Sequence, residues 1–273
     1  IVSSSLEGVR SLMAYTQSSM GSISPTSICS RYSSSFSRNS CSYKKRGIGN
    51  YFLCQSTSSV LPRRLLVPYV LSIMNSFSGG ASKKPREALL AIKRGMLLFR
   101  QGDVLGSLLE FDKAIELDPR QKAFLWQRGL SLYYLGRFEE GAEQFRVDVA
   151  ENPNDTEESI WCFLCESKMY GVDEARKQFL EVGRDSRPVM RDIYAMFKYG
   201  GDPESVVAKF CNGAENECFY SSLYAGLYYE AMGKSSEAKF HITASCNSSY
   251  GARCEDYMAA LSKVHCICRA WPI

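Results

Sequence analysis

Two cysteines three residues apart, Cys162 and Cys165, form the sequence pattern closest to a reactive site. A CxxC pair at a helix start can have a lowered thiol pKa and exchange disulfides with another protein. This pair instead follows Trp161 inside an expected helix, where positions i and i+3 share one face. Buried cysteines on such a face pack as small hydrophobic side chains. We therefore expect packing at Cys162 and Cys165, with a thiol-redox or enzyme-accessory role as the alternative.

A second group of residues near the C-terminus has side chains of the types that bind zinc. The group comprises Cys254, His265, Cys266 and Cys268. On a helix, Cys266 and Cys268 would point about 200° apart, so they could not share a metal ion. The chain has only two histidines. We therefore expect neither a metal site nor a cofactor.

No catalytic motif is complete in the sequence. Gly233-Lys234-Ser235 resembles the end of a phosphate-binding loop, but the residue five positions before Gly233 is Tyr228 instead of Gly. There is no G-x-S-x-G motif, and neither histidine has the spacing of a catalytic base. The acid pairs Glu139-Glu140 and Glu157-Glu158 begin expected helices, where carboxylates complement the helix dipole. The sequence therefore predicts that the chain is not an enzyme.

The charge is divided unevenly along the chain. Residues 1–84 contain 10 basic residues and one acidic residue, whereas residues 85–273 contain 23 basic and 28 acidic residues. The first segment also contains 23 serines and has no sustained apolar periodicity, so we expect it to be disordered. Its composition is typical of an organelle import presequence. We predict that residues 1–84 are a transit peptide and linker, with a solvated disordered tail as the alternative. The transit peptide would direct the chain to the chloroplast, in the stroma or at the thylakoid.

The apolar run at 65–71 follows Arg63-Arg64 and is too short to span a bilayer as a helix. A twin arginine before such a run can be a second targeting signal, which keeps the thylakoid lumen open as an alternative. We thus expect no transmembrane segment, while peripheral membrane association remains possible. The acidic charge of 85–273 argues against a nucleic-acid surface, which would need a basic face.

Special residues recur in the second segment at a spacing of 34 positions. The matched pairs are Gly95 and Gly129, Gly102 and Gly136, Phe111 and Phe145, and Pro119 and Pro153. A third copy follows with a one-residue slip, and part of the pattern returns at Gly226, Gly233 and Ala238. Repetition at this period is the signature of helical repeat proteins.

Each repeated residue has a physical role in a pair of packed helices. The first glycine lets the two helices approach closely, because no Cβ intervenes. The second glycine ends the first helix in a left-handed conformation. The aromatic residue fills the space between repeats, and the proline stops the second helix. The segment Phe111–Pro119 closely resembles the end of a tetratricopeptide repeat (TPR).

The chain as a whole resembles TPR proteins. Residues 88–260 resemble the bacterial TPR lipoprotein adaptors. The motifs that carry this resemblance are Asn152–Asp155 followed by Ile160-Trp161, and Leu223–Tyr229. The same residues also resemble plant plastid TPR proteins. Cys54 lacks the small neighbours of a lipid-modified cysteine, so the resemblance implies an adaptor role without a lipid anchor.

The expected fold is all-α: a right-handed TPR solenoid of about five helix pairs and a C-terminal capping helix, preceded by the disordered segment. The TPR domain spans 85–273. Its repeats are expected near 86–119, 120–153, 154–188, 189–215 (divergent) and 216–250, with the capping helix at 251–268. Within them, helix pairs are expected near 86–117, 120–151, 155–184, 188–211 and 216–246.

The TPR resemblance implies that a concave face lined by the first helix of each repeat binds a partner. On this chain the predicted groove is lined by Ile92, Met96, Phe99, Arg100, Trp126, Leu130, Tyr133 and Tyr134. An aromatic, apolar groove suits an extended or helical peptide anchored by its side chains. We therefore predict a non-catalytic adaptor that binds a protein or peptide, with a self-associating scaffold, for example a homodimer, as the alternative.

Overall fold

The structure, a computed structural model, describes residues 83–273. As predicted, this part of the chain is built from helices and loops, with no β-strand among its residues. The expectations for the transit peptide, Arg63-Arg64 and Cys54 fall outside the described residues. None of the helices in the described part is both long and apolar enough to cross a membrane.

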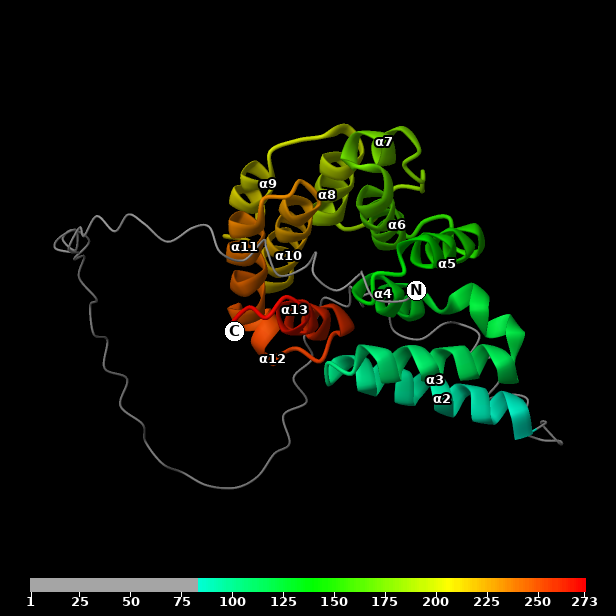
Figure 1. Cartoon of the computed structure of the whole chain (residues 1–273). Coiled ribbons are helices and arrows are strands. Elements are labelled where there is room, and N and C mark those ends of the chain that lie inside the picture. The colour runs from blue at the N-terminus through cyan, green and yellow to red at the C-terminus, as the bar shows by residue number, and fades with distance from the viewer. Residues whose placement is uncertain (1–82) are drawn as a thin grey trace, which may run out of the picture. The chain divides into compact units, whose positions relative to one another are not determined.

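Successive helices pack against one another as pairs (Figure 1). They are α2 (Lys83–Arg100) with α3 (Val104–Leu117), α4 (Trp126–Tyr134) with α5 (Phe138–Glu151), α6 (Thr156–Tyr170) with α7 (Val172–Lys177), α8 (Pro188–Tyr199) with α9 (Pro203–Phe210), and α10 (Glu215–Ala231) with α11 (Ser235–Asn247). A 3₁₀ helix, η1 (Pro119–Phe124), lies between the first two pairs. Two helices complete the chain, α12 (Ser249–Arg253) and α13 (Tyr257–Cys268).

The repeated glycines and aromatic residues meet inside the first two pairs. A Cβ atom added to Gly95 would lie 2.7 Å from the ring of Phe111, and one added to Gly129 would lie 2.6 Å from the ring of Phe145. Real Cβ atoms do not come this close, so only glycine allows the two helices to pack at this distance. The expected close approach is confirmed, and both rings are fully buried.

The third pair departs from this pattern for a visible reason. The residue 34 positions after Gly129 is Phe163, and its ring centroid lies 5.6 Å from that of Phe179. Two aromatic rings packed between helices need more space than one ring packed against a glycine. The second helix of this pair, α7, ends at Lys177 and does not extend to Phe179. The second helix expected up to residue 184 is therefore wrong, because residues 178–187 are not helical.

The predicted helix ends are observed where glycine and proline specify them. Gly102, Gly136 and Gly233 have φ values of 86°, 75° and 73° and follow the first helices of their pairs. These values lie in the left-handed region that favours glycine. The helices before Pro119 and Pro153 end at residues 117 and 151.

The start of the second pair differs from the helix expected from residue 120. The chain first forms η1, and α4 begins only at Trp126. Asp118 stabilises this turn, since its carboxylate accepts hydrogen bonds from the Arg120 guanidinium and the Gln121 side-chain amide. Pro119 also favours a short helical start, because its ring fixes φ.

The single capping helix expected over 251–268 is instead two helices. The Asp256 carboxylate accepts a hydrogen bond from the backbone N–H of Met258 and caps α13. As expected, α13 packs against α11, but it also packs against α2, the first helix of the described part (Figure 1). The last helix therefore does more than cover one end of the helix pairs.

Candidate partner-binding face

The eight predicted groove residues lie on two neighbouring first helices. Ile92, Met96, Phe99 and Arg100 belong to α2, and Trp126, Leu130, Tyr133 and Tyr134 belong to α4. Phe99, Leu130 and Tyr133 are buried, the other residues except Arg100 are partly exposed, and Arg100 is exposed. Much of the predicted groove is therefore already covered. Tyr257 of α13 lies against Phe99 and Trp126, whereas Tyr133 is buried against Phe138 and Trp161.

Tyr257, in the first turn of α13, makes the central aromatic contacts. Its ring is stacked on Phe99 and meets Trp126 edge-on, with centroids 5.2 Å apart in both cases. The Arg100 guanidinium lies 5.6 Å from the centroid of the same ring. Aromatic pairs in these geometries add to the stabilisation that burial provides. Tyr257 therefore occupies the groove as an aromatic anchor.

Near its C-terminal end, α13 is held by a buried polar cluster around His265. The Tyr134 hydroxyl lies 3.0 Å from His265 Nδ1, and Glu230 of α10 lies 2.7 Å from His265 Nε2. The second contact falls short of hydrogen-bond geometry, so it is a close electrostatic contact. Arg269 donates to Glu230 Oε1 at 2.6 Å, and Lys168 of α6 lies 3.4 Å from the same oxygen.

The charges of this cluster follow from burial and from its cations. Burial alone would raise the pKa of the Glu230 carboxyl, but contact with His265 and the charges of Arg269 and Lys168 outweigh burial and hold that pKa well below its usual range. Burial lowers the pKa of His265. A neutral His265 with its proton on Nε2 can accept a hydrogen bond from the Tyr134 hydroxyl at Nδ1. The groove residue Tyr134 thus binds α13 directly.

The N-terminal end of α13 is fixed from three sides. The hydroxyls of Tyr220 and Tyr250 donate to Asp256 Oδ2 at 2.8 Å and 2.7 Å. Arg100 donates to the backbone oxygen of Glu255 at 3.0 Å. These bonds connect α2, α10 and α12 to the start of α13. Both ends of the helix are therefore held by polar contacts, and its first turn is also held by the aromatic packing of Tyr257.

Tyr257 and Glu230 are not among the predicted site residues, and His265 was considered only as a zinc ligand, for which its neighbours are wrongly spaced. The contact partners of α13 lie more than 120 positions away on α2 and α4, so no local pattern points to them. The cap signal at Asp256 and the aromatic residue directly after it were the available clues. They identify a helix start but not the surface on which that helix lies.

The two cysteine groups have separate surroundings. Cys162 and Cys165 are buried in the hydrophobic core, as expected. Burial raises the pKa of Cys162 to about 12 and also raises that of Cys165, which disfavours the reactive thiolate. Within 83–273, no group of three or more His, Cys, Asp or Glu side chains is placed to hold a metal ion.

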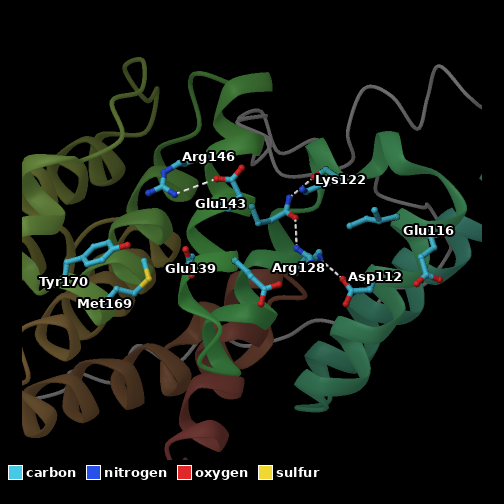
Figure 2. Close-up of a pocket in the computed structure, with 12 residues that line it drawn as sticks. Asp112, Glu116, Lys122, Arg128, Glu139, Glu143, Arg146, Met169 and Tyr170 are labelled. Carbon is cyan, nitrogen blue, oxygen red and sulfur yellow. Dashed lines mark hydrogen bonds and ion pairs between the residues drawn. The ribbon is translucent and has the colours of Figure 1, made fainter.

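A cavity of about 660 Å³ lies away from this face, among α3, η1, α5 and the end of α6 (Figure 2). It is lined by Asp112, Ile115, Glu116, Lys122, Arg128, Glu139, Glu140, Glu143, Gln144, Arg146, Met169 and Tyr170. Arg128 donates to Asp112 at 2.7 Å and to Gln144 at 3.3 Å, as the dashed lines show. Its wall thus carries charges of both signs, with acidic side chains in excess.

No model of a known protein family matches the chain.

Proposed function

We propose that the chain is a non-catalytic adaptor that binds a protein partner on the face formed by α2 and α4. In this proposal the helix pairs form a right-handed TPR solenoid, and the face is its concave side. The glycine contacts with Phe111 and Phe145 support the repeat assignment, because they occur at equivalent positions of two consecutive pairs.

The observation that carries the proposal is the position of α13. A helix of twelve residues lies on this face, with Tyr257 against Phe99 and Trp126. A face that accommodates one helix through an aromatic anchor has the shape and chemistry to bind another. The partner we propose is therefore a helical segment with an aromatic residue that replaces Tyr257.

Site-specific photo-crosslinking tests this proposal. A benzophenone amino acid replaces Met96 on the proposed face or, as a matched control on the outer surface of α5, Glu139. Each full-length variant is illuminated in stromal extract from chloroplasts. We expect adducts with one defined protein from position 96, and more of them when Tyr257 is also replaced by Ala. Adducts from position 139 alone would place the binding surface on the outer side, and equal adducts from both would contradict a specific face.

Substitution of Trp126 by Ala provides a second test on the same face. Trp126 is partly exposed, whereas Tyr133 is buried against Trp161 and Phe138, so replacing Tyr133 would disturb packing as well as binding. We expect Trp126→Ala to abolish the adduct while the helical circular dichroism signal persists. An unchanged adduct would exclude Trp126 from the interface.

The chloroplast location is part of the proposal and depends on the composition of residues 1–84. Import of the labelled chain into isolated chloroplasts tests it. We expect a shortened, protease-protected product that ends its import in the stroma or at the thylakoid. A full-length product that remains sensitive to added protease would contradict import.

Self-association is the second candidate, and exposed leucines favour it. Leu90 and Leu97 lie seven residues apart on α2, and Leu105 and Leu109 lie four residues apart on α3; all four are at least 46% exposed. Exposed apolar residues at helical spacing are typical of interfaces between proteins. Sedimentation equilibrium separates the candidates: a dimer that dissociates after Leu97→Glu would favour the scaffold, and a monomer would favour the adaptor.

A further inference from the structure

Two cysteines from different helices meet where α13 packs against α11. Cys246 belongs to α11 and Cys266 to α13, and their Sγ atoms are 3.7 Å apart. Both residues are buried, and both thiols are free in this structure. Neither forms part of the CxxC pair, so this pairing depends on how α13 packs.

The two sulfurs lie within a short movement of a disulfide bond. An S–S bond is about 2.05 Å long, so the two sulfurs need to approach by less than about 2 Å. Rotation about the Cα–Cβ bonds and a small shift of α13 can provide such a movement. Because the residues are twenty positions apart, the bond would close a loop that contains α12 and most of α13.

The surroundings of the pair favour reaction at Cys246. The contact with the Cys266 thiol is the largest influence on Cys246 and lowers its pKa, against the effect of burial. Ser262 and Lys263 act in the same direction. The thiolate is the form that attacks a disulfide. Cys162 is the opposite case, since burial dominates there and raises its pKa.

We propose that Cys246 and Cys266 are a regulatory dithiol whose disulfide fastens α13 to α11 and keeps the face formed by α2 and α4 covered. Without the bond, α13 is held only by non-covalent contacts and can leave the face. With the bond, Cys266 of α13 remains covalently attached to Cys246 of α11. The effect on partner binding rests on the proposed adaptor function, whereas the bond and its effect on α13 do not.

The oxidant is a disulfide, such as glutathione disulfide or the disulfide form of a dithiol protein. The Cys246 thiolate attacks one sulfur of the oxidant, and a mixed disulfide forms while one thiolate leaves. Cys266 then loses its proton and attacks Cys246 Sγ, which forms the Cys246–Cys266 bond and releases the second thiolate. Two electrons pass from the protein to the oxidant, which becomes two thiols. Because both sulfurs are buried, brief opening of α13 admits the oxidant.

Peptide mapping of the full chain after incubation with glutathione disulfide tests bond formation. Trypsin separates residues 240–253, which contain Cys246, from residues 264–269, which contain Cys266 and Cys268. We expect these two peptides to be linked in the wild type and in Cys268→Ser, but not in Cys266→Ser. Linkage that requires Cys268 instead of Cys266, or glutathione on both cysteines without linkage, would overturn the proposal.

Amide hydrogen exchange of residues 257–268 tests the second part, the fastening of α13. We expect exchange in the wild type to slow by about tenfold or more after oxidation, since the closed loop restricts opening. Cys246→Ala should show the same rate with and without oxidant. Unchanged exchange in an oxidised, linked wild type would overturn the fastening. The exchange measurement is made on the wild type, and Cys268→Ser changes an exposed residue, so both tests hold even if Cys266→Ser fails to fold. Failure of the photo-crosslinking test above would leave these two results intact.

Discussion

The inner and outer surfaces of the first two helix pairs differ in what covers them. The inner surface carries Phe99 and Trp126 and is packed against α13. The outer surface carries ion pairs such as Arg128 with Asp112 around an open cavity. The same helices thus present an apolar surface that another helix has bound and a charged surface that faces solvent.

This difference changes what a polar contact contributes. The Glu230 side chain is largely buried against the fully buried His265 and the partly buried Arg269, so loss of Glu230 leaves nearby cations without their counter-charge in a site of limited solvent access. Arg137 and Glu140, on the outer side, form an ion pair in which both side chains are largely exposed. Such a pair contributes little, because water replaces its contacts.

Replacement of the aromatic anchor should have the largest effect. Tyr257→Ala should lower the free energy of unfolding by about 3–4 kcal/mol, because it leaves a cavity between Phe99 and Trp126. Tyr257→Phe should leave it unchanged or raise it, since the Tyr257 hydroxyl is buried without a hydrogen-bond partner and its removal loses no bond. Urea unfolding measures both. A comparable loss for Tyr170→Ala, on the outer cavity, would remove the distinction between the surfaces.

The buried carboxylate should follow in size. Glu230→Gln should lower the free energy of unfolding by about 2–3 kcal/mol, because Arg269 and Lys168 lose their shared counter-charge in a buried site. It should also speed amide exchange in α13 more than in α3. Thermal unfolding and hydrogen exchange provide the measurements. No change in either would show that this cluster does not hold α13.

Acidification should weaken the inner surface before the outer one. The pKa of His265 is lower in the folded chain than its ordinary value of about 6.5. As the pH falls below about 6.5, the histidine is therefore protonated in the unfolded chain before it is protonated in the folded chain. Stability present above that pH is therefore lost as the pH falls toward the folded pKa. Urea unfolding at about pH 7.5 and about pH 5.5 measures this, with His265→Gln as the matched control. An equal loss in wild type and variant would assign the dependence to other groups.

The exposed ion pair should give the smallest effect. Arg137→Gln should change the free energy of unfolding by less than about 0.5 kcal/mol, and the change should shrink further at high salt. Chemical unfolding at two salt concentrations is the measurement. If Arg137→Gln lowered the free energy of unfolding as much as Glu230→Gln, the exposed ion pair would contribute as much to stability as the buried cluster, and the contrast between the two surfaces would fail.

Much of the fold could be predicted because its signals are local. Gly102 and Gly136 determine helix ends through their own backbone conformations, and Pro119 and Pro153 do so through ring sterics. The pairing of Gly95 with Phe111 is also nearly local, since sixteen residues span one helical hairpin. Where Phe163 replaces glycine the prediction of α7 was wrong, because the outcome depended on how two rings fill space.

The candidate site could be predicted only in part. The sequence identified Phe99 and Trp126 as residues of one face, since the TPR resemblance places both on the side of the first helices that lines the groove. It did not reveal that this face is covered, because the covering residue Tyr257 lies 158 positions after Phe99. Contacts at such separations depend on the summed geometry of every helix pair between them.

By itself, therefore, the sequence determined that residues 83–273 are helical, where most helices end and which side chains lie between the helices of a pair. Only the tertiary structure decided that α13 lies on α2 and α4, that His265 meets Tyr134 and Glu230, and that Cys246 meets Cys266. The physical reason is range: backbone conformation and helix periodicity act within a few residues, whereas the position of the last helix depends on the packing of all the others.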